Sequence, residues 1–180
     1  MTDAELVTLA EAAGFSAAVI PVTQVPVDEK FRSYCEENLC GQYNANYSCP
    51  PACGSPERLR RELLRGETAV ILTSRWLIDS YQDVRAIRRG KQSHNRAMLR
   101  LKETYRLAGY DSLCAGGSCC DLCRECNMAS GLPCVFPKQR FSCMSAYCVD
   151  VAKLTKQCGL EFAWDEKTLH LCGMLVLRKA

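Results

Sequence analysis

The sequence lacks the features that mark several large classes of protein. No stretch approaches the roughly 18 consecutive apolar residues that a membrane-spanning helix needs. The acidic start, residues 1–5, is followed by no apolar run and does not resemble a signal peptide. There is no Walker motif and no dinucleotide-binding glycine motif, so we expect no bound nucleotide. A C-x3-C-x2-C motif is also missing, so radical chemistry from S-adenosylmethionine is unsupported. These absences favour a cytoplasmic protein with no membrane segment.

Charge of either sign is nearly balanced, with a net charge of +3 at pH 7, which is too small to indicate nucleic-acid binding. Hydrophobic residues make up 48% of the 180 residues, enough for a core that needs no cysteine cross-links. The chain nevertheless contains 14 cysteines. In a reducing compartment, thiols at this density indicate metal binding or redox chemistry.

The densest group of cysteines is a C-x2-C-x2-C run with a fourth cysteine downstream, near Pro137. Bacterial ferredoxins hold a cubane iron–sulfur cluster on a run of this kind. Zinc prefers two separate C-x2-C pairs, and disulfides do not suit a reducing compartment. The sequence therefore predicts a [4Fe-4S] cluster, with Zn²⁺ as the alternative. The predicted ligands are Cys120, Cys123, Cys126 and Cys134. The neighbouring Cys119 is a spare thiol, a thiol near the cluster, or the ligand in place of Cys120.

A second group of four cysteines lies within nineteen residues nearer the N-terminus. Its members are Cys35, Cys40, Cys49 and Cys53. Four thiols this close together indicate a second metal site, although a polar loop with incidental thiols has the same pattern. Three ligands, Cys35, Cys40 and Cys49, would leave one iron open to a substrate. If Cys53 also binds, the site is closed and serves as a relay. Both groups could also converge on one larger cluster.

Caps and hydrophobic periodicity predict the secondary structure. We expect helices over residues 2–13, 55–66 and 82–107, with a further helix after residue 140. We expect strands over 16–22, 69–73 and 110–115, and a closing hairpin of 161–164 with 169–177. The strand at 69–73 is apolar on both faces, which favours helices on both sides of the sheet. The prediction is a single α/β domain over residues 1–180, with α+β as the alternative. A small sheet is flanked by helices, and cysteine-rich loops lie at 35–53 and 114–148.

The long helix at 82–107 is rich in arginine and lysine. The simplest interpretation is a solvated face, and the functional one is a docking surface for an acidic redox partner or an anionic substrate. His94 shares the apolar phase of this helix, so we interpret it as a helix residue that is partly buried rather than as a ligand.

The remaining cysteines lie towards the C-terminus. We expect Cys143 and Cys148 near the start of the last helix, where either could be a ligand because a helix N-terminus favours a thiolate. Cys158 lies at core phase. Cys172 and His170 lie on the last strand, and we interpret both as structural.

Three motifs resemble a family of small prokaryotic proteins known only as predicted metal-binding proteins of unknown function. The first runs from Cys40 to Pro51, with C-G-x-Y followed by N-Y-S-C-P-P. The second runs from Gly116 to Pro137 and contains the C-x2-C-x2-C run. The third runs from Arg140 to Val151. Their order and spacing cover roughly residues 35 to 177. The resemblance implies metal binding, iron–sulfur in kind, and no settled reaction.

Three functions fit these patterns. The first is a redox enzyme or reductase component with one or two [4Fe-4S] clusters, in which a small-molecule substrate could bind at an open iron. The second is an electron carrier without a substrate, which docks through the basic helix. The third is an interaction module stabilised by zinc. We favour the first, because a dedicated carrier can be much smaller than this chain.

Overall fold

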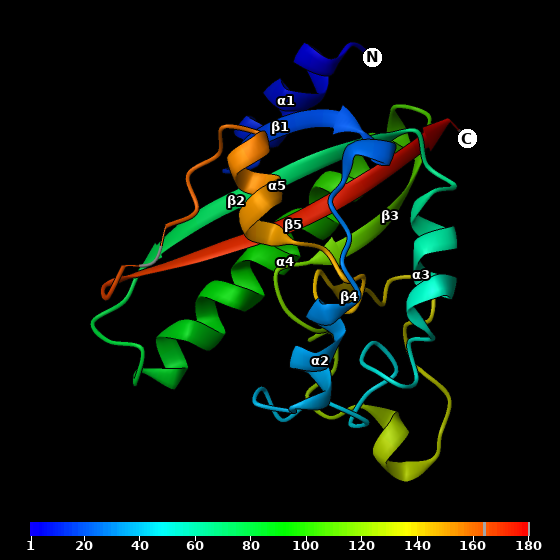
Figure 1. Ribbon diagram of the computed structural model, residues 1–180, viewed down its shortest axis with the longest axis vertical. Helices are drawn as coiled ribbons and strands as arrows, with labels where there is room; N and C mark the ends of the chain where they lie inside the picture. Colours follow the sequence, from blue (N-terminus) through cyan, green and yellow to red (C-terminus); the bar gives the residue numbers. More distant parts are fainter. Residues whose placement is uncertain (164, 180) are drawn as a thin grey trace.

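The computed structural model describes residues 1–163 and 165–179 (Figure 1). Within these residues, five strands form one sheet in the order β1-β2-β5-β3-β4. The strands are β1 (Ser16–Pro21), β2 (Thr68–Leu77), β3 (Tyr110–Gly116), β4 (Ser142–Cys143) and β5 (Thr168–Lys179). Neighbouring strands are antiparallel except β3 and β4, which are parallel.

The α-helices are α1 (Asp3–Ala12), α2 (Lys30–Glu36), α3 (Pro56–Leu63), α4 (Val84–Leu107) and α5 (Val151–Gln157), and the 3-10 helices are η1 (Val22–Gln24) and η2 (Asn127–Ser130). Side-chain caps mark the starts of α1, α3, α4 and α5, whereas α2 has none. Thr2 and Glu5 form a capping box on α1, and the Ser55 hydroxyl accepts a hydrogen bond from the Arg58 N–H at the start of α3. The predicted helices 2–13, 55–66 and 82–107 are confirmed.

Helices cover both faces of the sheet, as the apolar strand predicts. Along β2, Ala69 and Ile71 face a buried cluster that includes residues of α3 and α5. Val70 and Leu72 face the opposite cluster, with residues of α1 and α4. Successive side chains of a strand point to opposite faces, so each face of the sheet builds its own core. The α/β class is confirmed.

The predicted closing hairpin is wrong. Residues 161–163 form no strand, and residue 164 lies outside the described residues. Instead, β5 lies in the middle of the sheet and pairs with both β2 and β3. From Leu171 to Leu177 it is buried on both faces, so a central position suits it better than a place in a terminal hairpin.

The helix after residue 140 is shorter than expected. Ser142 and Cys143 form β4, and turns follow until Asp150 caps α5 through the Lys153 N–H. Cys148 adopts a φ of 59°, which a right-handed helix does not accommodate. Cys143 therefore lies in β4, away from the helix, whereas Cys148 lies close to the helix start but in the turn before the cap.

The cysteine-rich segments lie together beyond one end of the sheet, the lower end in Figure 1. The segment after β3 begins there, and α2 lies beside β4 at the same end. Across the described residues, no helix is both long enough and apolar enough to traverse a membrane.

Candidate metal centre

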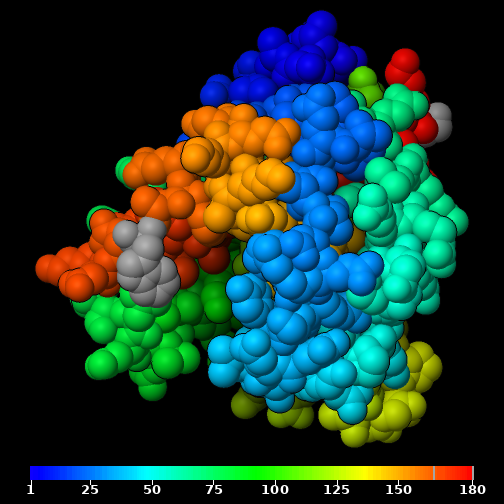
Figure 2. All heavy atoms as spheres, in the orientation of Figure 1, coloured from blue at the N-terminus to red at the C-terminus, as the bar shows by residue number. Residues whose placement is uncertain are grey.

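A cavity of about 1140 Å³ lies among the cysteine-rich segments. Its walls come from α2 and the loop after it, from the N-terminal half of α4, and from the segment that follows β3. Figure 2 shows the first and last of these segments side by side at the lower end of the molecule. The cysteines that line the cavity are Cys35, Cys40, Cys49, Cys119, Cys120, Cys123, Cys126, Cys134 and Cys143.

All four cysteines of the ferredoxin-like run line this cavity. The sulfur of Cys120 has hydrogen-bond donors around it, namely the Ser48 hydroxyl and the backbone N–H groups of Leu122 and Phe141. Burial nevertheless raises the pKa of the Cys120 thiol. Donors directed at a sulfur stabilise the thiolate form that a metal requires, so this environment suits a ligand.

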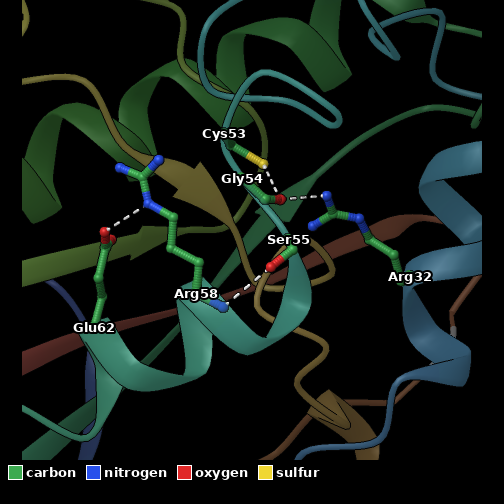
Figure 3. Close-up of polar contacts among 6 residues, drawn as sticks. All are labelled: Arg32, Cys53, Gly54, Ser55, Arg58 and Glu62. Carbon is green, nitrogen blue, oxygen red and sulfur yellow. Dashed lines mark hydrogen bonds and ion pairs between the residues drawn. The ribbon is translucent and has the colours of Figure 1, made fainter.

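The second predicted group is divided. Cys35, Cys40 and Cys49 line the cavity, whereas Cys53 is not among the described residues that do so. The Cys53 thiol is 3.9 Å from the Gly54 carbonyl oxygen, which also accepts a hydrogen bond from Arg32 Nη2 at 2.7 Å (Figure 3). Burial raises the pKa of this thiol. Cys53 thus belongs to the structural contacts at the start of α3.

Two thiols outside the two predicted groups of four, Cys119 and Cys143, also line the cavity. The Cys35 thiol hydrogen bonds to Cys143, and the Cys49 thiol hydrogen bonds to Cys119. The contact with Cys35 and the backbone N–H groups of Ala146 and Ser145 lower the pKa of Cys143 to about 6. The contact with Cys49 also lowers the pKa of Cys119. Each pair therefore contains one thiol that ionises more easily than an ordinary cysteine.

The partners of these two residues respond in the opposite direction. The pKa of Cys35 is raised, first by its hydrogen bond to Cys143 and then by burial. The pKa of Cys49 is raised for the same two reasons, with Cys119 as the partner. In each pair the thiol with the raised pKa donates a hydrogen bond to the sulfur of its partner, so the two sulfurs are in direct contact.

Hydrogen bonds hold α2 and the residues before it against the turns that follow β4. Arg32 Nη1 donates to the Ala146 carbonyl oxygen at 2.9 Å, and this arginine is only 7% exposed. The N–H of Asp28 donates to the Cys148 carbonyl oxygen at 2.8 Å. Val27 and Val149 form an isolated β-bridge. These bonds explain why Cys35 and Cys143 meet although they are far apart in the sequence.

The loop after α2 is joined to the ferredoxin-like loop by Tyr47. Its hydroxyl donates to the Leu132 carbonyl oxygen at 2.8 Å, and the Arg140 guanidinium lies 5.9 Å from the ring centroid. On the other side, Asn95 Nδ2 of α4 donates to Ser118 Oγ at 2.9 Å, next to Cys119. The cysteines thus sit on loops that are fixed to rigid elements.

Gly116 and Gly117 let the chain pass close to its neighbours. A Cβ atom on Gly117 would lie 2.9 Å from His94 Cδ2, and one on Gly116 would lie 2.6 Å from Phe141. His94 is fully buried, its Nδ1 lies 2.7 Å from Ser74 Oγ, and burial lowers its pKa to about 4. His94 is a helix residue, as predicted, but it is completely rather than partly buried.

The cavity carries an excess of positive charge. Its basic residues are Arg88, Lys91, Arg96, Arg124 and Arg140, and its acidic ones are Asp121 and Glu125. The first three come from α4, so one side of the basic helix forms part of the wall. An anionic group inside the cavity would be favoured by this field.

The other thiols near the C-terminus lie in structural positions. Cys172 of β5 is buried in the core, and burial raises its pKa to about 12. Cys158 packs against the same core and burial raises its pKa too. Cys148 is 1% exposed. Such thiols do not ionise near neutral pH, which favours a packing role.

The residues 18–177 match the model of a family described as predicted metal-binding protein (DUF2284). The chain belongs to this family. Neither the curated proteins nor the solved structures gave a match. The family is thus described as metal-binding, and the cysteines that line the cavity are the candidate ligands in this member of the family. Across the described residues, no three His, Cys, Asp or Glu side chains surround one position closely enough to hold a single metal ion.

Proposed function

We propose that this protein is an iron–sulfur protein that acts in redox chemistry, as an enzyme or as a reductase component. One cluster is held by Cys120, Cys123, Cys126 and Cys134. The observation that carries this proposal is the ferredoxin-type spacing of four cysteines, all of which line one large cavity. When bound there, a [4Fe-4S] cluster would supply one-electron transfer.

The residues present fit such a group. The four side chains are sulfur ligands of the type that iron–sulfur clusters require, and the donors around Cys120 suit a thiolate. The loop that carries them is tied down by the Tyr47 and Asn95 contacts, and this lowers the conformational entropy lost on binding.

The cavity supports an enzyme over a simple carrier. Its volume of about 1140 Å³ exceeds what one cluster needs and reaches the range of small-molecule sites. Arg88, Lys91 and Arg96 would attract an anionic substrate. Exposed arginines on the same helix, such as Arg85 and Arg89, offer a docking surface for an acidic electron-donor protein.

The test begins with protein purified without oxygen. We expect a brown protein with a broad visible absorption band that dithionite bleaches reversibly, and an electron paramagnetic resonance (EPR) signal in the reduced state. Cys123→Ser should remove the signal of the loop cluster, whereas Cys158→Ser, the matched control in the core next to α5, should retain it. A colourless protein that contains zinc would overturn the proposal in favour of a zinc-stabilised module.

A second measurement separates enzyme from carrier. Sulfite and nitrite, added separately, serve as small anionic oxidants for the reduced protein. An enzyme of this kind should be reoxidised by at least one of them, and Lys91→Ala should slow that reaction by about tenfold because the attraction of the anion is weakened. Reoxidation that is independent of Lys91 would favour the carrier.

A further inference from the structure

We propose that Cys35, Cys49, Cys119 and Cys143 form a second four-thiolate centre for an iron–sulfur cluster, distinct from the one on the 120–134 loop. This inference rests on the proposed function, because it extends the same cofactor chemistry to a second ligand set. It regroups the N-terminal cysteines, since Cys119 and Cys143 take the places that the sequence assigns to Cys40 and Cys53.

The contacts among the thiols carry the regrouping. Cys143 hydrogen bonds to Cys35, and it lies close enough to interact electrostatically with both Cys49 and Cys119. Cys119 in turn hydrogen bonds to Cys49. The four sulfurs therefore form one connected group on the cavity wall. Four thiols linked in this way repel one another when ionised together unless a cation neutralises them, which is what bound iron does.

These thiols come from three separate parts of the chain, and the protein brings them together by its own bonds. Arg32 ties the α2 segment to the Ala146 carbonyl oxygen, and Asn95 fixes Ser118 beside Cys119. Asn46 Oδ1 accepts the Ser48 N–H at 2.9 Å and so shapes the turn before Cys49. The group is thus held in position by protein contacts alone, as expected of a built site.

The two cysteines that are left out differ from these four. Cys53 shares the Gly54 carbonyl oxygen with Arg32 and lies among the contacts of α3 (Figure 3). Cys40 is exposed, although it does line the cavity. A cubane with four thiolates has no free iron corner, so the second centre would pass electrons and leave substrate binding to the rest of the cavity.

Cys119 and Cys120 are consecutive residues that serve different groups. Cys119 contacts Cys49, whereas Cys120 contacts Ser48 and the N–H groups of Leu122 and Phe141. Their Cα atoms are about 3.8 Å apart across a trans peptide bond. Two clusters bound at adjacent residues would exchange single electrons directly: one centre is oxidised as the other is reduced, and no atom is transferred.

The test counts iron and acid-labile sulfide in the full chain, purified without oxygen. We expect about eight of each in the wild type and about four of each in Cys143→Ser and Cys119→Ser. Cys53→Ser is the matched control from the N-terminal group, and Cys40→Ser is an exposed control from the cavity wall. Both should retain about eight. EPR of the doubly reduced wild type should show magnetic coupling between two clusters, and Cys143→Ser should show one uncoupled cluster.

The outcomes separate this inference from the proposed function. If the wild type holds about four irons, all lost in Cys123→Ser and unaffected by Cys143→Ser, the loop cluster stands and the second centre is overturned. Zinc in the second site, or iron loss in Cys53→Ser equal to that in Cys143→Ser, overturns it as well. Iron in Cys123→Ser but none in Cys143→Ser would instead overturn the loop cluster. Circular dichroism of each variant shows whether the protein has folded, including any variant that holds no iron.

Discussion

The sheet and the cysteine-rich end of this molecule are held together by different means. β2 and β5 are apolar on both faces, and residues such as Leu72 and Leu175 are completely buried. The cysteine-rich end has little regular structure, and its segments are joined by polar contacts such as those of Arg32 and Tyr47. Hydrophobic burial therefore stabilises the sheet, whereas we expect a bound metal to complete the other end.

Truncation of a core side chain should have the largest effect on stability. Leu175 lies in the central strand β5 with no exposed surface. Leu175→Ala should lower the free energy of unfolding by about 2–5 kcal/mol, because it removes buried methyl groups and leaves a cavity. Denaturant unfolding followed by circular dichroism measures this. The matched control Leu77→Ala, at an 89% exposed position in β2, should stay within about 0.5 kcal/mol of the wild type.

Acid should lower the free energy of unfolding, because the buried His94 side chain becomes protonated. Because burial lowers its folded-state pKa from 6.5 to about 4, the folded state binds fewer protons than the unfolded state between these values. Its contribution, about 3 kcal/mol, is therefore present above pH 6.5 and is lost as the pH falls to 4. Denaturant unfolding of metal-free protein at several pH values should show a free energy of unfolding that falls with a distinct slope between pH 6.5 and pH 4. His94→Gln should flatten it, and an unchanged slope would contradict the assignment.

The contact between α2 and β4 can be broken at Arg32. Arg32→Ala leaves the Ala146 and Gly54 carbonyl oxygens without their charged donor and should cost about 1–3 kcal/mol. It should also lower the iron content, because Cys35 is no longer held against Cys143. The control is Arg58→Ala, which removes an exposed pair with Glu62 near the same site (Figure 3). Equal effects of the two substitutions would show that the Arg32 contacts do not position the site.

A smaller effect is expected at Tyr47. Tyr47→Phe removes the hydroxyl that donates to the Leu132 carbonyl oxygen, while the ring remains beside Arg140. The expected cost is about 0.5–1.5 kcal/mol, confined to the loops. Hydrogen exchange should rise over residues 43–50 and 127–134 and stay unchanged in β2 and β5. Faster exchange in the sheet would mean that the two regions unfold together.

The sheet-forming part of the chain could be predicted well because its signals are local. Thr2 with Glu5 marks a helix start, and the apolar run along β2 shows on its own that both faces are buried. The place of β5 could not be read in this way, because a strand that is apolar on both faces does not specify its neighbours. The short turn before β5 favoured a hairpin with 161–164. In the structure β5 pairs instead with β2 and β3, which are distant in the sequence.

At the cysteine-rich end, less could be predicted from the sequence, because most of the contacts there join distant residues. The run from Cys120 to Cys126 could be recognised from spacing, because its cysteines are close together in the sequence. The partnership of Cys35 with Cys143 could not be recognised, because it depends on α2 folding back onto β4 through Arg32 and the Val27–Val149 bridge. The one local signal was a low pKa expected for Cys143 at a helix start. The helix in fact begins at Val151, and the contact with Cys35 is the main cause of the low pKa.

The measurement that tests the central claim most directly is acid-labile sulfide, determined together with iron, in protein purified without oxygen. If thiols from both loops bind two [4Fe-4S] clusters, the protein should contain equal amounts of iron and sulfide, about eight of each per chain. Protein without inorganic sulfide, whether it carries zinc or no metal, would contradict the account.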